Sequence, residues 1–239
     1  MKQPKSSILN SRILMTSFNK KQKVLITGTG RSGTHYTARL LQTLGLDVPH
    51  EQIGEHGTAS WKHIRSGVFE VIGKNRTQHI DSHGFDQIIH QVRHPLKVIA
   101  SMQTFSLSSW SYMAKFIDID TEASPLMRGM QAWLRWNEMI EHEADWRFQI
   151  EQINNAFPRI CEAFNIEPAE IPHLSEKQRD SRKNRYKPLS WANLENIDQG
   201  LTKLIMEKTS VYGYDTQEEI FEKKKDHITK YLKRLLPGH

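Results

Sequence analysis

The sequence predicts an α/β fold in which a parallel β-sheet lies between two layers of helices, a three-layer arrangement. Short apolar runs alternate with longer segments of helical periodicity along much of the 239-residue chain, and this alternation is typical of parallel sheets. The apolar runs are rich in β-branched residues, as buried strands are. No repeat or clean linker divides the chain, so we expect a single domain over residues 23–239 after a basic, flexible arm over residues 1–22.

The positions of the elements follow from these patterns and from glycine and proline at their ends. Strands are predicted at residues 23–27, 87–92 and 146–150. Helices are predicted at residues 33–44, 95–102, 125–143, 153–164, 191–197, 200–208 and 216–235. Residues 46–60 contain two glycines and a proline and are expected to be mostly loop.

Composition narrows the class of protein. Lys and Arg total 33 against 27 Asp and Glu, a net charge of +6, which suits an anionic ligand or polymer without choosing between them. Cys161 is the single cysteine, so an intramolecular disulfide and a cysteine-built metal site are excluded, and we expect it to be a buried thiol in a helix. No run of ~20 apolar residues and no secretory signal core is present, which predicts a soluble, cytoplasmic protein.

The most informative segment is residues 28–35, GTGRSGTH, which follows the first predicted strand and leads into a helix. A strand, a glycine-rich turn and a helix direct backbone N–H groups and the positive helix end to one point, which makes an anion site. Arg31 adds a fork of donors suited to oxyanions, and Ser32, Thr34 and His35 add side-chain donors. A charge-assisted hydrogen bond contributes about 1.5–3 kcal/mol, so several can hold a phosphate.

This loop does not complete the pattern of nucleoside triphosphatases. Gly28 and Gly33 have the Walker A spacing, but Thr34 stands at the lysine position and His35 at the Mg²⁺-ligand position. A γ-phosphate would lose both of its usual anchors, so hydrolysis of ATP or GTP is disfavoured.

A dinucleotide-binding loop is the alternative reading, because Gly28, Gly30 and Gly33 match G-x-G-x-x-G. That fold needs a second strand that ends in an acidic residue about 20 residues on. Residues 46–48 are too short for this strand, and Pro49 follows them. A tight turn without a ligand is also less favoured, because it would not need Arg, Ser and Thr beside three glycines.

A second candidate element lies where the next predicted strand ends. Arg93 follows that strand, Pro95 starts the next helix, and Ser101 lies on the helix eight residues after Arg93. Ligands of parallel α/β sheets bind at the carboxyl ends of the strands. Arg93 and Ser101 can therefore both bind one phosphate, from two sides. Either residue alone would be explained more simply as an ordinary surface or helix side chain.

These two elements resemble those of sulfotransferases that use 3′-phosphoadenosine 5′-phosphosulfate, whose first loop carries [KR]-S-G-T and whose second carries the Arg and Ser. The resemblance covers roughly residues 23–165 and implies a P-loop NTPase-like sulfotransferase fold. It implies transfer of a sulfuryl group, without a metal, from this donor to a hydroxyl or amine. The two elements must then face a common cleft. The donor-binding residues it implies are Gly30, Arg31, Ser32, Gly33, Thr34, His35, Arg93 and Ser101.

The resemblance also suggests catalytic residues. Members of the family use His or Glu as the base, and a positioned base contributes roughly 10²–10⁴-fold. Glu51 lies 20 residues after Arg31, as in tyrosylprotein and some bacterial carbohydrate sulfotransferases, so Glu51 is the predicted base and His50 the alternative. Arg31 is predicted to stabilise charge on the leaving phosphate, although the family often has lysine there and arginine cannot donate its proton.

A late basic segment completes the predicted site. Arg182 and Lys183 resemble a loop that contacts the 3′-phosphate in the family, but Asn184 stands where the family has glycine. A solvated run of charge explains these residues equally well.

The sequence does not identify the acceptor, which could be a glycan, a small alcohol, a lipid or a peptide. A non-catalytic nucleotide-binding or nucleic-acid-binding protein is a further alternative, but its basic residues should cluster beside aromatic side chains, and here they are dispersed.

Overall fold

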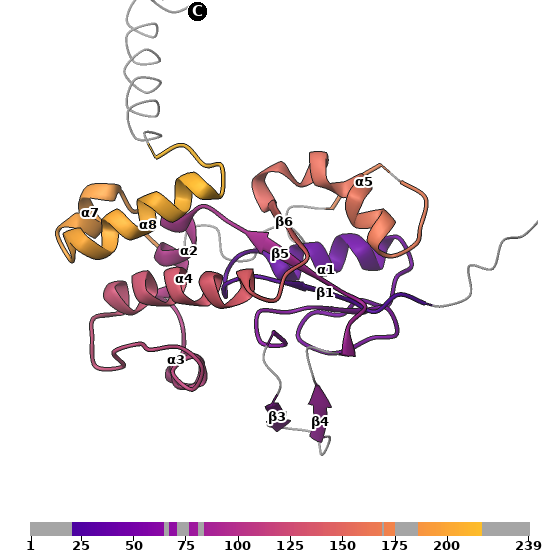
Figure 1. Cartoon of the computed structure of the whole chain (residues 1–239), viewed down its shortest axis with the longest axis horizontal. Helices are drawn as coiled ribbons and strands as arrows, with labels where there is room; N and C mark the ends of the chain where they lie inside the picture. The colour runs from indigo at the N-terminus through magenta and orange to yellow at the C-terminus, as the bar shows by residue number, and fades with distance from the viewer. Residues whose placement is uncertain are drawn as a thin grey trace, which may run out of the picture.

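The computed structural model describes residues 21–64, 67–70, 77–80, 84–168, 170–174 and 186–216. A four-stranded, all-parallel sheet lies at its centre with helices on both faces (Figure 1). The strand order is β2-β1-β5-β6, with β2 at Gly57–Ala59, β1 at Val24–Thr27, β5 at Gln87–Val92 and β6 at Trp146–Gln149. The predicted α/β class with a parallel sheet between helices is therefore confirmed.

The predicted helices that fall on described residues are present, with ends within three residues of the prediction. One face of the sheet carries α1 (Thr34–Thr43) and α5 (Ile153–Ala163). The other face carries α2 (Pro95–Met102), α4 (Pro125–Glu141), α7 (Trp191–Glu195) and α8 (Gln199–Val211). Proline occupies the first turn of both α2 and α4, where its missing N–H leaves no helical bond unmade.

Several elements depart from the prediction. Residues 46–60 were expected to be loop, yet β2 forms the edge of the sheet, where Val24 pairs with Gly57. A short helix, α3, occupies Leu107–Met113, and an antiparallel pair joins β3 (Gly67–Glu70) to β4 (Thr77–Ile80). The G-T-A sequence of β2 carries no strand signal of its own, so pairing with β1 defines it. The predicted arm and the last predicted helix lie almost wholly outside the described residues.

The side chains of the strands pack into two separate hydrophobic cores. In β1, Val24 and Ile26 pack toward α1 and α5, whereas Leu25 packs toward α2 and α4. Both faces of this strand are buried, which explains its unbroken apolar sequence. Trp133 and Trp136 of α4 are also buried, and Cys161 of α5 is buried as predicted. In the described part of the chain, no helix has the length and apolar character needed to cross a membrane.

A buried histidine marks the face of β5 that packs against α4. The ring of His90 is 1% exposed, and its Nε2 lies 3.0 Å from Oδ1 of Asn137. The Asn137 amide in turn donates to the carbonyl of Trp133 at 2.7 Å. Burial lowers the pKa of His90 to about 4, because the hydrogen bond to Asn137 compensates only in part.

This burial predicts a loss of stability in acid. Between its unfolded pKa of about 6.5 and its folded pKa of about 4, His90 binds a proton only in the unfolded chain. The free energy of unfolding should therefore fall by roughly 3 kcal/mol as the pH drops through this window. Urea unfolding from pH 7 to pH 4 should show a shallower fall in His90→Gln and the full fall in His142→Gln, a change at an exposed position. Equal slopes in all three proteins would contradict the assignment to His90.

Candidate functional site

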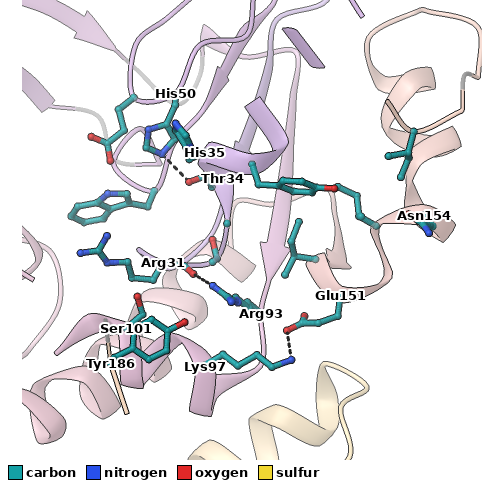
Figure 2. Close-up of a pocket in the computed structure, with 18 of the residues that line it drawn as sticks. Arg31, Thr34, His35, His50, Arg93, Lys97, Ser101, Glu151, Asn154 and Tyr186 are labelled. Carbon is teal, nitrogen blue, oxygen red and sulfur yellow. Dashed lines mark hydrogen bonds and ion pairs between the residues drawn. The ribbon is translucent and has the colours of Figure 1, made fainter. Parts of the chain in front are cut away.

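A pocket of about 1040 Å³ lies at the carboxyl ends of β1, β5 and β6 (Figure 2). Nearly all predicted site residues that the structure describes line this pocket. They are Arg31, Ser32, Gly33, Thr34, His35, His50, Glu51, Arg93 and Ser101. Gly30 lies immediately before them in the chain, and the predicted Arg182 and Lys183 lie outside the described residues. The structure thus brings both predicted elements to one cleft, at the edge where parallel sheets bind ligands.

The loop after β1 presents the positive end of α1 to the pocket. Gly33 takes a left-handed conformation, with φ of 102°, and its carbonyl accepts from the N–H groups of Tyr36 and Thr37. The N–H groups of Thr34 and His35 precede the first helical hydrogen bond and have no partner within the helix. Together with the helix dipole, these groups form a site suited to a phosphate or sulfate oxygen.

A buried amide holds this loop against the sheet. Gln91 of β5 donates from Nε2 to the carbonyl of Ser32 at 2.9 Å, and its Oε1 accepts from the hydroxyl of Thr37 at 2.6 Å. The loop and the first turn of α1 are therefore tied to the same side chain. Because a buried amide is costly to leave unpaired, this arrangement gives the loop one defined shape.

Arg31 is the strained residue of the loop. Its φ of 76° places it in the left-handed region, which costs roughly 1–2 kcal/mol for a residue with a side chain. Nη1 of Arg93 donates to the carbonyl of Arg31 at 3.1 Å, the bond drawn in Figure 2. The second predicted element thus braces the backbone of the first, a role for Arg93 that its sequence position did not predict.

Two buried polar atoms on pocket-lining residues of this loop have no hydrogen-bond partner among the described residues. They are Nε of Arg31 and Oγ of Ser32. Buried polar groups are normally paired, so orphaned donors beside a pocket indicate a place for a ligand acceptor. Both residues line the pocket, so the chemistry of the site fits an oxyanion.

Two histidines form one corner of the pocket. The rings of His35 and His50 meet edge to face with centroids 5.1 Å apart, and Nε2 of His50 lies 3.2 Å from the hydroxyl of Thr34. Burial lowers the pKa of His50 to about 4, and burial together with the charge of Arg39 lowers the pKa of His35. Both imidazoles are therefore neutral at pH 7, and negative charge bound at the loop would raise both pKa values.

The predicted base, Glu51, lies beside this corner. Its backbone is left-handed, with φ of 58°, and its carboxylate lies 2.9 Å from Nζ of Lys62. Burial raises the pKa of Glu51, but the hydrogen bond and the charge of Lys62 lower it by more, so the net shift is downward. Glu51 is therefore ionised at neutral pH and can accept a proton or a hydrogen bond.

Several other pocket residues were not predicted from the sequence. Lys97 had a signal that was missed, because it lies on α2 one turn before Ser101, the predicted phosphate-binding residue of that helix. Its Nζ lies 3.3 Å from Glu151, which also accepts from the Tyr214 hydroxyl at 2.6 Å. The remaining lining residues, which only packing brings here, are Tyr36, Trp61, Phe105, Ile150, Ile153, Asn154, Ile171, Pro172, His173 and Tyr186.

The chain matches no protein-family model, and comparisons with curated proteins and with solved structures also find no match. The nature of the ligand is therefore inferred from the pocket itself. A helix N-terminus and two arginines line it, and these groups suit an anion.

The packing of Phe105 on Gly30 gives a test of the loop geometry. A Cβ at Gly30 would lie 2.5 Å from Cζ of Phe105. Gly30→Ala should therefore lower the free energy of unfolding by about 1–3 kcal/mol. This loss should shrink by about 1 kcal/mol in a Phe105→Leu background, because leucine ends short of the clash. Denaturant unfolding of the four proteins gives the coupling as a double-mutant cycle.

Gly84→Ala is the matched control, because a Cβ there meets nothing within 4 Å and, as at Gly30, the backbone φ is not positive. Its effect should add to that of Phe105→Leu. If Gly30→Ala and Phe105→Leu were also additive, the contact between them would be absent in solution.

Proposed function

We propose that the protein is a sulfotransferase that moves a sulfuryl group from 3′-phosphoadenosine 5′-phosphosulfate to a hydroxyl or amine. The observation that carries this proposal is that the Arg31 loop and the Arg93/Ser101 pair line one pocket. A nucleotide with a phosphate at each end of its ribose needs two such groups within one cavity. The cavity volume of about 1040 Å³ is also in the range of sites for nucleotide-sized ligands.

Under this proposal the two elements bind opposite ends of the donor. The N-terminus of α1 with Arg31 and Ser32 binds the 5′-phosphosulfate, and Arg93 with Ser101 binds the 3′-phosphate. Lys97 lines the same pocket and adds a third cation. The strand, loop and helix around Arg31 are those expected of a P-loop-like sulfotransferase fold, which we include in the proposal.

The chemistry requires a leaving-group stabiliser and a base. The acceptor oxygen or nitrogen attacks sulfur, the bond from sulfur to the phosphate oxygen breaks, and its electron pair stays with 3′-phosphoadenosine 5′-phosphate. Arg31 stabilises the charge that develops on that phosphate. Glu51 takes the acceptor proton, because it is ionised at neutral pH and lines the pocket, whereas Nε2 of His50 lies against Thr34.

The dinucleotide alternative has less support. It requires a strand after α1 that ends in an acidic residue. The next strand in the sheet is β2, which ends at Ala59 and is followed by Ser60. The Arg93/Ser101 pair would also have no role in a dinucleotide site.

Calorimetry with 3′-phosphoadenosine 5′-phosphate tests the donor site. We expect the intact protein to bind it and Arg93→Ala to bind it about 10- to 100-fold more weakly, through loss of a charge-assisted contact. Adenosine 5′-phosphosulfate, which lacks the 3′-phosphate, should be affected much less. Arg135→Ala, on the solvent side of α4, is the matched control.

If the intact protein did not bind 3′-phosphoadenosine 5′-phosphate, the proposal would be wrong. An equal loss for both nucleotides would mean that Arg93 acts only by bracing Arg31.

The assignment of the base has its own test. Glu51→Gln should lower turnover at least 10²-fold, because the amide cannot take the acceptor proton, and should leave affinity for 3′-phosphoadenosine 5′-phosphate nearly unchanged. Transfer of radiolabelled sulfuryl to a panel of acceptors provides the measurement. Glu55→Gln, at an exposed carboxylate, should behave as the wild type. Normal turnover in Glu51→Gln would place the base elsewhere, with His50 as the next candidate.

A further inference from the structure

The turn between α2 and α3 reaches back to the Arg31 side chain. Its guanidinium carbon lies 4.6 Å from the centroid of the Phe105 ring, and its Nη2 donates to the hydroxyl of Thr104 at 3.3 Å. We infer that Phe105 and Thr104 are positioning residues that aim the Arg31 guanidinium at the leaving phosphate. This inference rests on the proposed function and names residues that neither predicted element contains.

The Thr104 hydroxyl has a defined direction. It donates to the carbonyl of Ser101 at 2.8 Å, so its proton is already used. Only its oxygen lone pairs remain for Arg31, and the guanidinium has donors alone. The bond therefore runs one way, from Arg31 to Thr104, and ties the guanidinium to the helix end that carries Ser101.

Two neighbouring tryptophan rings hold the Phe105 ring in place. Its centroid lies 5.9 Å from that of Trp61 and 5.3 Å from that of Trp110, and both tryptophans are buried. Its tip fills the space in which a Cβ of Gly30 would lie. A ring held this way offers the guanidinium a fixed face, and such a cation–π contact favours one orientation of an otherwise mobile side chain.

These contacts leave part of the guanidinium free for the ligand. Nη2 is engaged by Thr104, whereas the buried Nε has no partner in the described part of the chain. Donors aimed in advance at a developing charge lower the barrier because they need no reorganisation during the reaction. Misplaced donors lose this advantage even when the nucleotide still binds through Arg93, Ser101 and the backbone of the loop. Loss of either positioning residue should therefore reduce turnover more than affinity.

Four variants test the positioning role of Phe105 and Thr104. Two quantities are measured for each variant: the rate of conversion of 3′-phosphoadenosine 5′-phosphosulfate to 3′-phosphoadenosine 5′-phosphate, and the Kd of 3′-phosphoadenosine 5′-phosphate. Phe105→Leu should lower kcat about 3- to 30-fold, the range that a cation–π contact corresponds to. Thr104→Val should lower kcat about 3- to 10-fold, as loss of one hydrogen bond does, and Thr104→Ser should restore it. The Kd should stay within about twofold of the wild-type value. Phe116→Leu removes a ring 5.1 Å from Tyr112 and makes no contact with Arg31, so it should leave kcat unchanged.

A spectroscopic measurement on the ligand-free protein is independent of turnover. The Nε–Hε NMR signal of Arg31, identified by its absence in Arg31→Lys, should carry the ring-current shift of Phe105. Phe105→Leu should move it, and Phe116→Leu should leave it in place.

The outcomes separate the inference from the proposed function. If the wild-type protein neither binds the nucleotide nor turns over the donor, both are overturned. If it does so and Phe105→Leu and Thr104→Val keep the wild-type kcat, only the inference is overturned. Equal losses of affinity and kcat would also overturn the inference, since they would indicate a general packing defect. An unmoved Arg31 signal in Phe105→Leu would overturn it too, since it would indicate that Phe105 and Arg31 are not in contact.

Discussion

The hydrogen bond from Arg93 to the carbonyl of Arg31 is the interaction on which the site depends. It joins residues 62 positions apart and connects the ends of β5 and β1. Arg31 needs it because a left-handed backbone is unfavourable for a residue with a side chain. With this bond in place, the loop presents its free donors and the N-terminus of α1 to the same cavity that contains Arg93.

Strand β5 supports the site from within the sheet. Two consecutive polar residues, His90 and Gln91, point to opposite faces, as alternation along a strand requires. His90 pairs with Asn137 on α4, and Gln91 pairs with Thr37 on α1 and with the carbonyl of Ser32. Buried polar side chains paired in this way favour a single arrangement of helices and loop around the strand. The rigidity of the loop beside the pocket therefore comes from a polar network in the core.

The charges in the pocket are arranged for an anion. Each of two acidic residues lies against a lysine, Glu51 against Lys62 and Glu151 against Lys97. Arg31 and Arg93 form no ion pair with any described residue, so their charge is not offset in the same way. Burial keeps His35 and His50 neutral, and they can gain protons when negative charge arrives. This balance favours a polyanionic ligand and leaves Glu51 ionised.

What the sequence determined by itself was local. Propensity and periodicity over a few residues predicted the strand, glycine loop and helix around Arg31. They also predicted the strand ahead of Arg93 and the spacing from Arg93 to Ser101. These local features were enough to predict the fold class and most of the residues that line the described pocket. Tertiary structure alone decided that Arg93 braces Arg31, that Gly57–Ala59 forms an edge strand, and that Phe105 lies under the guanidinium. These features join residues far apart in the chain, and no local pattern encodes them because each depends on how separate elements pack.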